Sequence, residues 1–343
     1  MRSKPKPIHL GIVIIVLFSL RQAPKLEPCQ NSNNIGDNTS ESARREVGQF
    51  SYLPKGRWIK GRKSEHAAPI CCGWDLDNYM KVPECGRVPM PRVNGGGWRG
   101  RPDFYAHLGG HGCSCKNFQD DYEWSETPSW NAYDTCQKLN GRRVLLIGDS
   151  TMGQVGTTLM NALHPAGCQI NITCVESDTL INKEMGNLNR GPHWFDSVKQ
   201  NKGWADIVII SAGPHIYGRN NFNLVVESII NGTRTLKKDN PNMEVIWKTQ
   251  PPAGCTSEPT TMIEFSGDYQ YNEFYERDMY CLNELPRHGI HVLDLRMLYY
   301  RSDAHIHSGH HSGNPKRKDC VHMCLPGPLD IIAPLFSQML DQL

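Results

Sequence analysis

From Gly141 to the C-terminus, short and nearly continuous apolar runs alternate with segments whose apolar residues recur at helical spacing. Such runs are typical of strands that are buried on both faces of a sheet. They predict strands at residues 143–147, 205–210, 244–249 and 291–295. The other segments predict helices at residues 151–163, 224–238, 271–285 and 330–343. The pattern therefore indicates an α/β fold with a mostly parallel sheet and helices on both of its faces.

In parallel sheets of this kind, ligands bind beyond the carboxyl ends of the strands. Ser150, Gly213, Gln250 and Asp294 lie at or just after the ends of the four predicted strands. We expect these four residues to lie on one rim of the sheet, and the sequence predicts the functional site there.

The chain before Gly141 differs in character. Residues 49–140 are rich in Gly, Pro, Trp and Cys and show no sustained hydrophobic period. Disulfides can replace a regular core in such a segment, so we predict a Cys-rich, loop-rich subdomain at 49–140 that packs on a catalytic domain at 141–343. Zinc is the weaker explanation for the closely spaced cysteines, because an oxidising compartment favours disulfides. Residues 21–48 are polar and without period, which predicts a flexible stem.

The first 20 residues contain a basic leader and an apolar run at 8–20. The length of this run suits the core of a signal peptide. A cleavage site is hard to find, however, because Arg21 occupies a position that requires a small residue and Pro24 follows closely. We therefore predict a signal anchor at 1–20, with a cleaved signal peptide as the alternative. The rest of the chain would then be luminal, as a single-pass type II membrane protein of the Golgi or secretory pathway, or secreted.

Cysteine content supports an oxidising compartment, since 13 cysteines is a high count for a cytosolic protein of 343 residues. The predicted disulfide cysteines are Cys71, Cys72, Cys85, Cys113, Cys115, Cys136, Cys168, Cys174, Cys255, Cys281, Cys320 and Cys324. The number is odd, and Cys29 in the stem is our choice for a free thiol or for a bridge between two chains of a dimer. Sequons at Asn38, Asn171 and Asn231 fit N-glycosylation in the lumen.

The charge balance argues against one class of partner. Three of the 37 basic residues precede the apolar run, which leaves 34 against 35 acidic residues in the remainder. Nucleic-acid-binding proteins need a basic face that displaces counterions. The sequence therefore predicts no nucleic-acid partner.

The tripeptide Gly148-Asp149-Ser150 follows a predicted buried strand and opens a predicted helix. A serine at such a turn has its hydroxyl exposed near the positive end of the helix, as a nucleophile requires. Taken alone, however, the tripeptide favours a helix whose N-cap is simply Asp149 or Ser150.

A nucleophilic serine needs a base, and the base needs an orienting carboxylate. Asp319 and His322 occur near the C-terminus. Cys320 lies between them, and Cys324 follows His322 by two residues. The i, i+3 spacing would place the carboxylate and the imidazole on one face of a helical turn, where one ring nitrogen remains available for Ser150. A surface histidine is the alternative for a lone His in this position.

The two motifs together resemble the GDSL/SGNH esterase superfamily, and more closely the PC-esterase group that includes the plant trichome-birefringence-like polysaccharide O-acetyltransferases. The resemblance extends from about residue 50 to the C-terminus and is carried by residues 55–59 (KGRWI), 148–152 (GDSTM), 301–305 (RSDAH) and 319–327 (DCVHMCLPG). It implies an SGNH-like three-layer α/β/α sandwich. It also implies that Ser150 is the acylated nucleophile, His322 the general base and Asp319 its orienting acid.

For the oxyanion hole, the resemblance implies the backbone N–H of Ser150 and a second donor near Gly213. The plant proteins carry an Asn-x-Gly-His block at this position, whereas this chain reads Ser211-Ala-Gly-Pro-His215. Ser211 or His215 is expected to replace the amide, and Gly191 is the candidate for the glycine of another superfamily block. Asp303 and His305 are expected to border the site.

Histidines crowd the segment from Asp303 to His311 (DAHIHSGHH). Imidazoles at this density can bind zinc. The Ser-Gly and Gly-Asn-Pro sequences indicate an exposed loop, so we predict no metal and keep zinc as the second interpretation.

Taken together, the sequence predicts an O-acetyltransferase that transfers an acetyl group to a sugar hydroxyl of a polysaccharide or glycan. No bound cofactor is expected, and the acetyl donor would be acetyl-CoA or a relayed acetyl carrier. A secreted carbohydrate acetylesterase with the same three residues is the alternative, since the same site can deliver the acetyl group to water. A non-catalytic glycan-binding protein is the alternative from another class.

Overall fold

The computed structural model describes residues 51–52, 56–61, 92–93, 121–163, 166–167, 171–181, 191–200, 205–250, 268–306 and 319–343. All of them belong to one compact unit, Ser42–Leu343. The predicted signal anchor and stem, with Cys29 and Asn38, lie outside the described residues, as does most of the predicted Cys-rich subdomain. Within the described ranges, no helix combines the length and the apolar character needed to cross a membrane.

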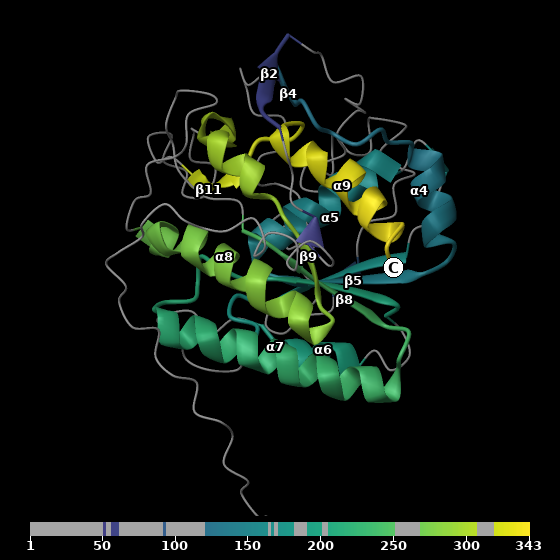
Figure 1. Ribbon diagram of the computed structural model, residues 1–343, viewed down its shortest axis with the longest axis vertical. Helices are drawn as coiled ribbons and strands as arrows, with labels where there is room; N and C mark the ends of the chain where they lie inside the picture. Colours follow the sequence, from purple (N-terminus) through teal and green to yellow (C-terminus); the bar gives the residue numbers. More distant parts are fainter. Residues whose placement is uncertain are drawn as a thin grey trace, which may run out of the picture. The chain divides into compact units, whose positions relative to one another are not determined.

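A parallel sheet forms the centre of the described fold (Figure 1). Its strand order is β1-β9-β8-β7-β5-β6-β3, and every neighbouring pair runs parallel. The strands are β1 (Ser51–Tyr52), β3 (Arg92–Val93), β5 (Arg143–Gly148), β6 (Asn171–Glu176), β7 (Ile207–Ser211), β8 (Glu244–Lys248) and β9 (His291–Leu293). Gly148 at the end of β5 pairs with Glu176 on one side and Ser211 on the other. The segments that leave β5, β6 and β7 therefore meet at one rim.

Helices cover both faces of this sheet (Figure 1). They are α4 (Ala132–Leu139), α5 (Ser150–Leu163), α6 (Trp194–Gln200), α7 (Arg219–Asp239), α8 (Phe274–Glu284) and α9 (Ile332–Leu340). Side chains alternate along β5, so that Val144 and Leu146 pack with α5 and α9, whereas Leu145 and Ile147 pack with α6, α7 and α8. The result is the three-layer α/β/α sandwich that the sequence predicted.

Two small antiparallel ladders lie outside the main sheet. One joins β2 (Trp58–Lys60) to β4 (Tyr122–Trp124), and the other joins β10 (His305–Ile306) to β11 (Asp319–Met323). Short 3₁₀ segments connect several elements: η4 (Asp268–Glu273), η5 (Leu285–His288), η6 (Arg296–Tyr300), η7 (Ser302–Ala304) and η8 (Pro328–Ile331).

The four predicted strands are confirmed as β5, β7, β8 and β9, and each predicted helix has a counterpart among α5, α7, α8 and α9. The prediction missed β6, the neighbour of β5. Its sequence NITCVE alternates apolar with polar residues, yet Thr173 is buried with Ile172 and Cys174 because β6 lies inside the sheet. Helices α4 and α6 were also missed, because each is short.

Two cysteines correct the disulfide prediction. Cys174 and Cys281 are free and fully buried, one on each side of the sheet. Burial raises the pKa of Cys174 to about 12 and that of Cys281 well above its ordinary value. Each packs in an apolar cluster, so they serve as small apolar core residues.

Three other cysteines, Cys136, Cys320 and Cys324, are disulfide-bonded. The remaining predicted disulfide cysteines lie outside the described residues: Cys71, Cys72, Cys85, Cys113, Cys115, Cys168 and Cys255.

Candidate active site

The turn between β5 and α5 presents Ser150. A Cβ atom on Gly148 would lie 2.4 Å from the carbonyl oxygen of Ser211, so only glycine allows β5 and β7 to approach this closely. Asp149 is buried, and its Oδ1 accepts hydrogen bonds from the Thr151 backbone N–H (2.9 Å) and hydroxyl (2.6 Å). Asp149 thus stabilises the first turn of α5 and leaves the hydroxyl of Ser150 available for another partner.

That partner is His322. Its Nε2 lies 2.7 Å from Ser150 Oγ, although the two residues are 172 positions apart in sequence. His322 is buried and Ser150 is partly exposed. This hydrogen bond has the geometry of a nucleophile with its general base. The structure therefore brings together two of the three residues that the sequence predicted as catalytic.

The local geometry around Asp319 corrects one step of the prediction. Residues 319–323 form strand β11 and not a helical turn. In a regular strand, residues three apart face opposite sides, but the ladder with β10 is irregular here. Met323 pairs with His305 and Asp319 with Ile306, so residues 320–322 bulge out of the register. The side chain of Asp319 lies outside the described residues.

Segments far apart in sequence meet at Arg301. The guanidinium of Arg301 stacks 4.8 Å from the ring of Trp58 and forms an ion pair with Asp303 at 2.9 Å. His305 is fully buried, and its Nδ1 lies 3.0 Å from the carbonyl oxygen of Ser302. Since His305 also pairs with Met323, it supports the strand that carries His322.

Ser211 does not fit the role of oxyanion donor that the sequence suggested. Its hydroxyl is fully buried, donates to the carbonyl oxygen of Lys248 (2.9 Å) and lies 2.7 Å from the carboxamide of Gln250. When the Gln250 oxygen faces β7, it also accepts from the N–H groups of Ala212 (3.1 Å) and Gly213 (3.2 Å). The donors of Ser211 and Gly213 are then used within the fold.

His215 and Gly191 remain as the other candidates. His215 follows β7 and lies 3.8 Å from Asp178, which follows β6. Because β5 lies between β6 and β7, this contact spans the end of the strand that leads to Ser150. Gly191 has a positive φ of 95°, and a Cβ there would lie 2.3 Å from the carbonyl oxygen of Glu176. Both residues therefore lie at the rim where Ser150 is found.

Buried ionisable groups lie beneath this rim, and the sequence analysis missed them as a group. They are Asp149, Lys248 and Asp278, and all three are buried. Burial lowers the pKa of Lys248 to about 8, against the attraction of the two carboxylates. Burial raises the pKa of Asp278 to about 7, even though the Tyr299 hydroxyl and the Gln250 N–H donate to it. A charged residue inside an apolar run, such as Lys248 in EVIWKT, was the sequence signal from which these buried groups could have been predicted.

No group of metal-ligating side chains occurs within the part of the chain that the structure describes. Of the histidine-rich segment, only residues 303–306 are described, and His307, His310 and His311 lie outside.

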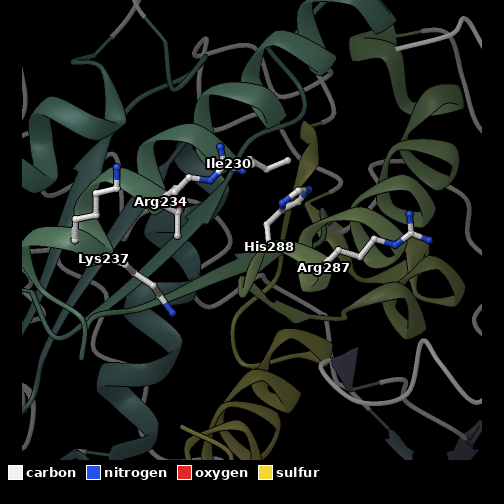
Figure 2. A pocket seen from close by; sticks show the side chains of 7 residues that line it. Ile230, Arg234, Lys237, Arg287 and His288 are labelled. Atoms are coloured by element: carbon white, nitrogen blue, oxygen red, sulfur yellow. The ribbon is translucent and has the colours of Figure 1, made fainter. Parts of the chain in front are cut away.

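A second concave feature lies elsewhere on the unit. It is a groove of about 470 Å³ lined by Ile230, Thr233, Arg234, Lys237, Lys238, Arg287 and His288. Figure 2 shows the side chains that line it, with five of them labelled. Lys237 contacts Glu244, the first residue of β8, so the groove lies at the strand edge opposite Ser150. Glu244 and Glu284 balance part of its charge, and the C-terminus of α7 favours cations at this end. The groove is therefore separate from the candidate active site.

Comparison with known proteins finds one matching family model. Residues 193–339 match the model of the PC-esterases, described as the GDSL/SGNH-like acyl-esterase family found in Pmr5 and Cas1p. No curated protein shows significant similarity to this chain.

Several solved structures are similar at low sequence identity. One is the periplasmic domain of a lipopolysaccharide acetyltransferase from Salmonella ser. Paratyphi A (16% identity, 59% of this chain, 84% of that chain, TM-score 0.40). Another is Est24, a carbohydrate acetylesterase from Sinorhizobium meliloti (15% identity, 59% of this chain, 97% of that chain, TM-score 0.33). A third is a carbohydrate esterase family 2 enzyme from Corynascus thermopiles (14% identity, 66% of this chain, 71% of that chain, TM-score 0.35).

The family match includes His322 and Asp319 and begins after Ser150. It agrees with the three-layer fold and with the resemblance found in the sequence, and its reaction class is acyl transfer or ester hydrolysis. Residues 193–339 are therefore similar to the PC-esterase family of GDSL/SGNH-like acyl-esterases.

Proposed function

We propose that this protein is an O-acetyltransferase that moves an acetyl group to a sugar hydroxyl of a polysaccharide or glycan, through an acyl intermediate on Ser150. The observation that carries the proposal is the 2.7 Å contact between His322 Nε2 and Ser150 Oγ at the carboxyl ends of the strands. Parallel sheets bind their ligands at this edge.

The reaction has two halves. In the first, His322 Nε2 accepts the proton of Ser150 Oγ while Oγ attacks the acetyl carbonyl carbon of the donor. The tetrahedral intermediate collapses, His322 returns the proton to the leaving group, and an acetyl ester on Ser150 remains. In the second half, His322 accepts the proton of the sugar hydroxyl, whose oxygen attacks the acetyl ester. Collapse releases the acetylated sugar and restores the proton to Ser150.

His322 can act as a base through Nε2 only when its other ring nitrogen, Nδ1, carries the proton. We assign Asp319, at the start of β11, as the carboxylate that accepts from Nδ1–H and stabilises the imidazolium. For the oxyanion hole we assign the backbone N–H of Ser150, with His215 or Gly191 as the second donor. Ser211 is not assigned, because its hydroxyl is hydrogen-bonded to Lys248 and Gln250.

The proposal also includes a cellular location and an acetyl donor. The apolar run at 8–20 and the sequons support a luminal enzyme, attached by an N-terminal anchor or secreted. Acetyl-CoA or a relayed acetyl carrier would supply the acetyl group.

Hydrolysis is the main alternative, since water could replace the sugar hydroxyl in the second half of the reaction. A non-catalytic glycan-binding protein would not need a serine and a histidine at hydrogen-bond distance, so the contact between Ser150 and His322 favours catalysis.

The test uses the full-length protein purified in detergent, with an acetyl donor and a panel of glycans. Mass spectrometry then measures acetylated glycan, free acetate and acetylated Ser150. We expect acetylated glycan with the wild-type protein and a loss of at least about 10³-fold in the Ser150→Ala and His322→Ala variants, because both residues act in each half of the reaction. Thermal unfolding should be nearly unchanged in Ser150→Ala.

Each other outcome has a definite meaning. Acetate without acetylated glycan would support the esterase. Wild-type turnover in Ser150→Ala would exclude an acyl-serine mechanism. Glycan binding without any turnover, unchanged in Ser150→Ala, would support the binding protein.

A further inference from the structure

The position of His322 is not explained by the sheet that carries the nucleophile. His322 belongs to β11, which pairs only with the two-residue strand β10 within the described fold. The register of that ladder jumps across residues 320–322. A separate contact must therefore set the distance between the imidazole and Ser150.

Gln154 makes this contact. It lies four residues after Ser150 on α5, so both side chains leave the same face of the helix. Its Nε2 donates to the carbonyl oxygen of Met323 at 2.7 Å, and its Oε1 accepts from the Met323 N–H at 3.1 Å. Gln154 is 2% exposed, and Met323 is buried as well. We call this pair of hydrogen bonds the Gln154 bridge.

The bridge connects the two halves of the site through one helix turn. Met323 follows His322 directly, and Gln154 is one turn from Ser150. The carboxamide uses a donor and its acceptor on the N–H and the C=O of one residue, which fixes the distance and the orientation of the Met323 backbone. A leucine or an alanine could make neither bond.

The strand is held from its other side as well. Met323 pairs with His305, and the N–H of Cys324 donates to the carbonyl oxygen of Ala304 at 2.7 Å. Loss of the Gln154 bridge should therefore leave β11 folded and attached, while the imidazole loses its fixed position relative to Ser150.

We infer that Gln154 is a positioning residue for His322, which holds the general base at hydrogen-bond distance from the nucleophile. The inference rests on the proposed role of Ser150 and His322, and it applies to transfer and to hydrolysis alike. A displacement of about 1 Å in an active site can cost about 100-fold in rate.

The test compares Gln154→Leu, which retains the volume and removes both hydrogen bonds, with Gln154→Glu, which retains an acceptor for the Met323 N–H. Thr158→Val is the matched control: Thr158 lies one turn further along α5, is buried, and its hydroxyl has no hydrogen bond within the described residues. The measurements are kcat and KM with p-nitrophenyl acetate, the rate of Ser150 labelling by a fluorophosphonate, and thermal unfolding.

We expect kcat and the labelling rate to fall about 10- to 100-fold in Gln154→Leu, with KM changed by less than about threefold, because acylation needs the base in place. Gln154→Glu should fall less than Gln154→Leu, and Thr158→Val should match the wild type. The pH profile adds a readout that general loss of stability would not change. The wild-type labelling rate should become independent of hydroxide concentration at alkaline pH, whereas in Gln154→Leu it should continue to rise with hydroxide concentration.

A Gln154→Leu protein that labels at the wild-type rate with the wild-type pH profile would overturn the inference and leave the proposed function intact. Should Gln154→Leu fail to fold, Gln154→Glu decides the matter by the same two measurements. If the wild-type protein itself labels no faster than Ser150→Ala, the proposed function fails, and this inference fails with it.

Discussion

At the scale of the residue, Asp278 shows how burial controls an ionisable group beneath the rim. Burial raises its pKa to about 7 from an ordinary value of 3.8. Between these two pH values the folded state retains a proton that the unfolded state has lost. Stability therefore falls as the pH rises from about 4 to about 7, because the folded state binds more protons there.

Asn resembles the protonated carboxyl, so Asp278→Asn should remove this pH dependence. We expect the variant and the wild type to be similarly stable at pH 4. At pH 8 the variant should be the more stable, by at most about 4 kcal/mol, since each pKa unit corresponds to about 1.4 kcal/mol. Urea unfolding at a series of pH values measures the difference.

Asp206→Asn is the control with the opposite sign. Burial alone would raise the pKa of Asp206, but the hydrogen bonds and the charge of Arg143 lower it. Its stabilising contribution is present at neutral pH and is lost on acidification, so the Asn variant should be less stable at pH 7 and unchanged near pH 2.

The prediction for Asp278 would be contradicted if the free energy of unfolding of Asp278→Asn followed the same pH dependence as that of the wild type. Asp278 would then titrate normally.

At the scale of the element, α7 presents the sequon that best fits modification. Asn231 lies on its exposed face, whereas the sequon at Asn171 falls in β6, where Thr173 is buried inside the sheet. We expect Asn231 to carry a glycan when the full-length protein is made in a secretory host, because the exposed side of a helix leaves room for it.

Two substitutions remove this sequon, one at its asparagine and the other at its threonine. Asn231→Gln and Thr233→Val should each abolish one glycan, seen as a mass decrease that matches the effect of enzymatic deglycosylation. Thr233 is buried and its hydroxyl has no hydrogen bond within the described residues, so Val should leave thermal unfolding unchanged. Full glycosylation in both variants would assign the modification to another site, and its absence from the wild type would argue against a luminal protein.

At the scale of the whole molecule, the two free cysteines report on the integrity of the sandwich. Cys174 packs in the cluster with α5 and α9, and Cys281 in the cluster with α7. Both are fully buried, and burial raises the pKa of both thiols, so neither forms the reactive thiolate in the folded state.

We therefore expect iodoacetamide to leave both cysteines unmodified in the native protein. In urea without reductant, both should be alkylated together as the sandwich unfolds, while Cys136, Cys320 and Cys324 remain protected by their disulfides. Peptide mass spectrometry identifies the modified residues. Alkylation of Cys281 before Cys174 would show that the two sides of the sheet open separately, against a single cooperative unit.

The hydrophobic pattern was sufficient to predict most of the fold, and the motifs were sufficient to predict the contact between Ser150 and His322. The strands β5, β7, β8 and β9 are continuous apolar runs, so their burial and parallel arrangement follow from local sequence. The resemblance carried by Gly148-Asp149-Ser150 and the segment around His322 likewise implied that the two side chains meet, as they do at 2.7 Å.

Only the tertiary structure decided the partners of individual polar groups. Nothing local in the sequence marks Gln154 as the residue that bonds the Met323 backbone, or shows that Ser211 donates into β8 and that Cys174 and Cys281 stay reduced. The i, i+3 spacing of Asp319 and His322 suggested a helical turn, but pairing with β10 makes the segment a strand. The physical reason is range: hydrophobic periodicity acts over neighbouring residues, whereas a hydrogen bond such as the Gln154 bridge joins groups 169 residues apart.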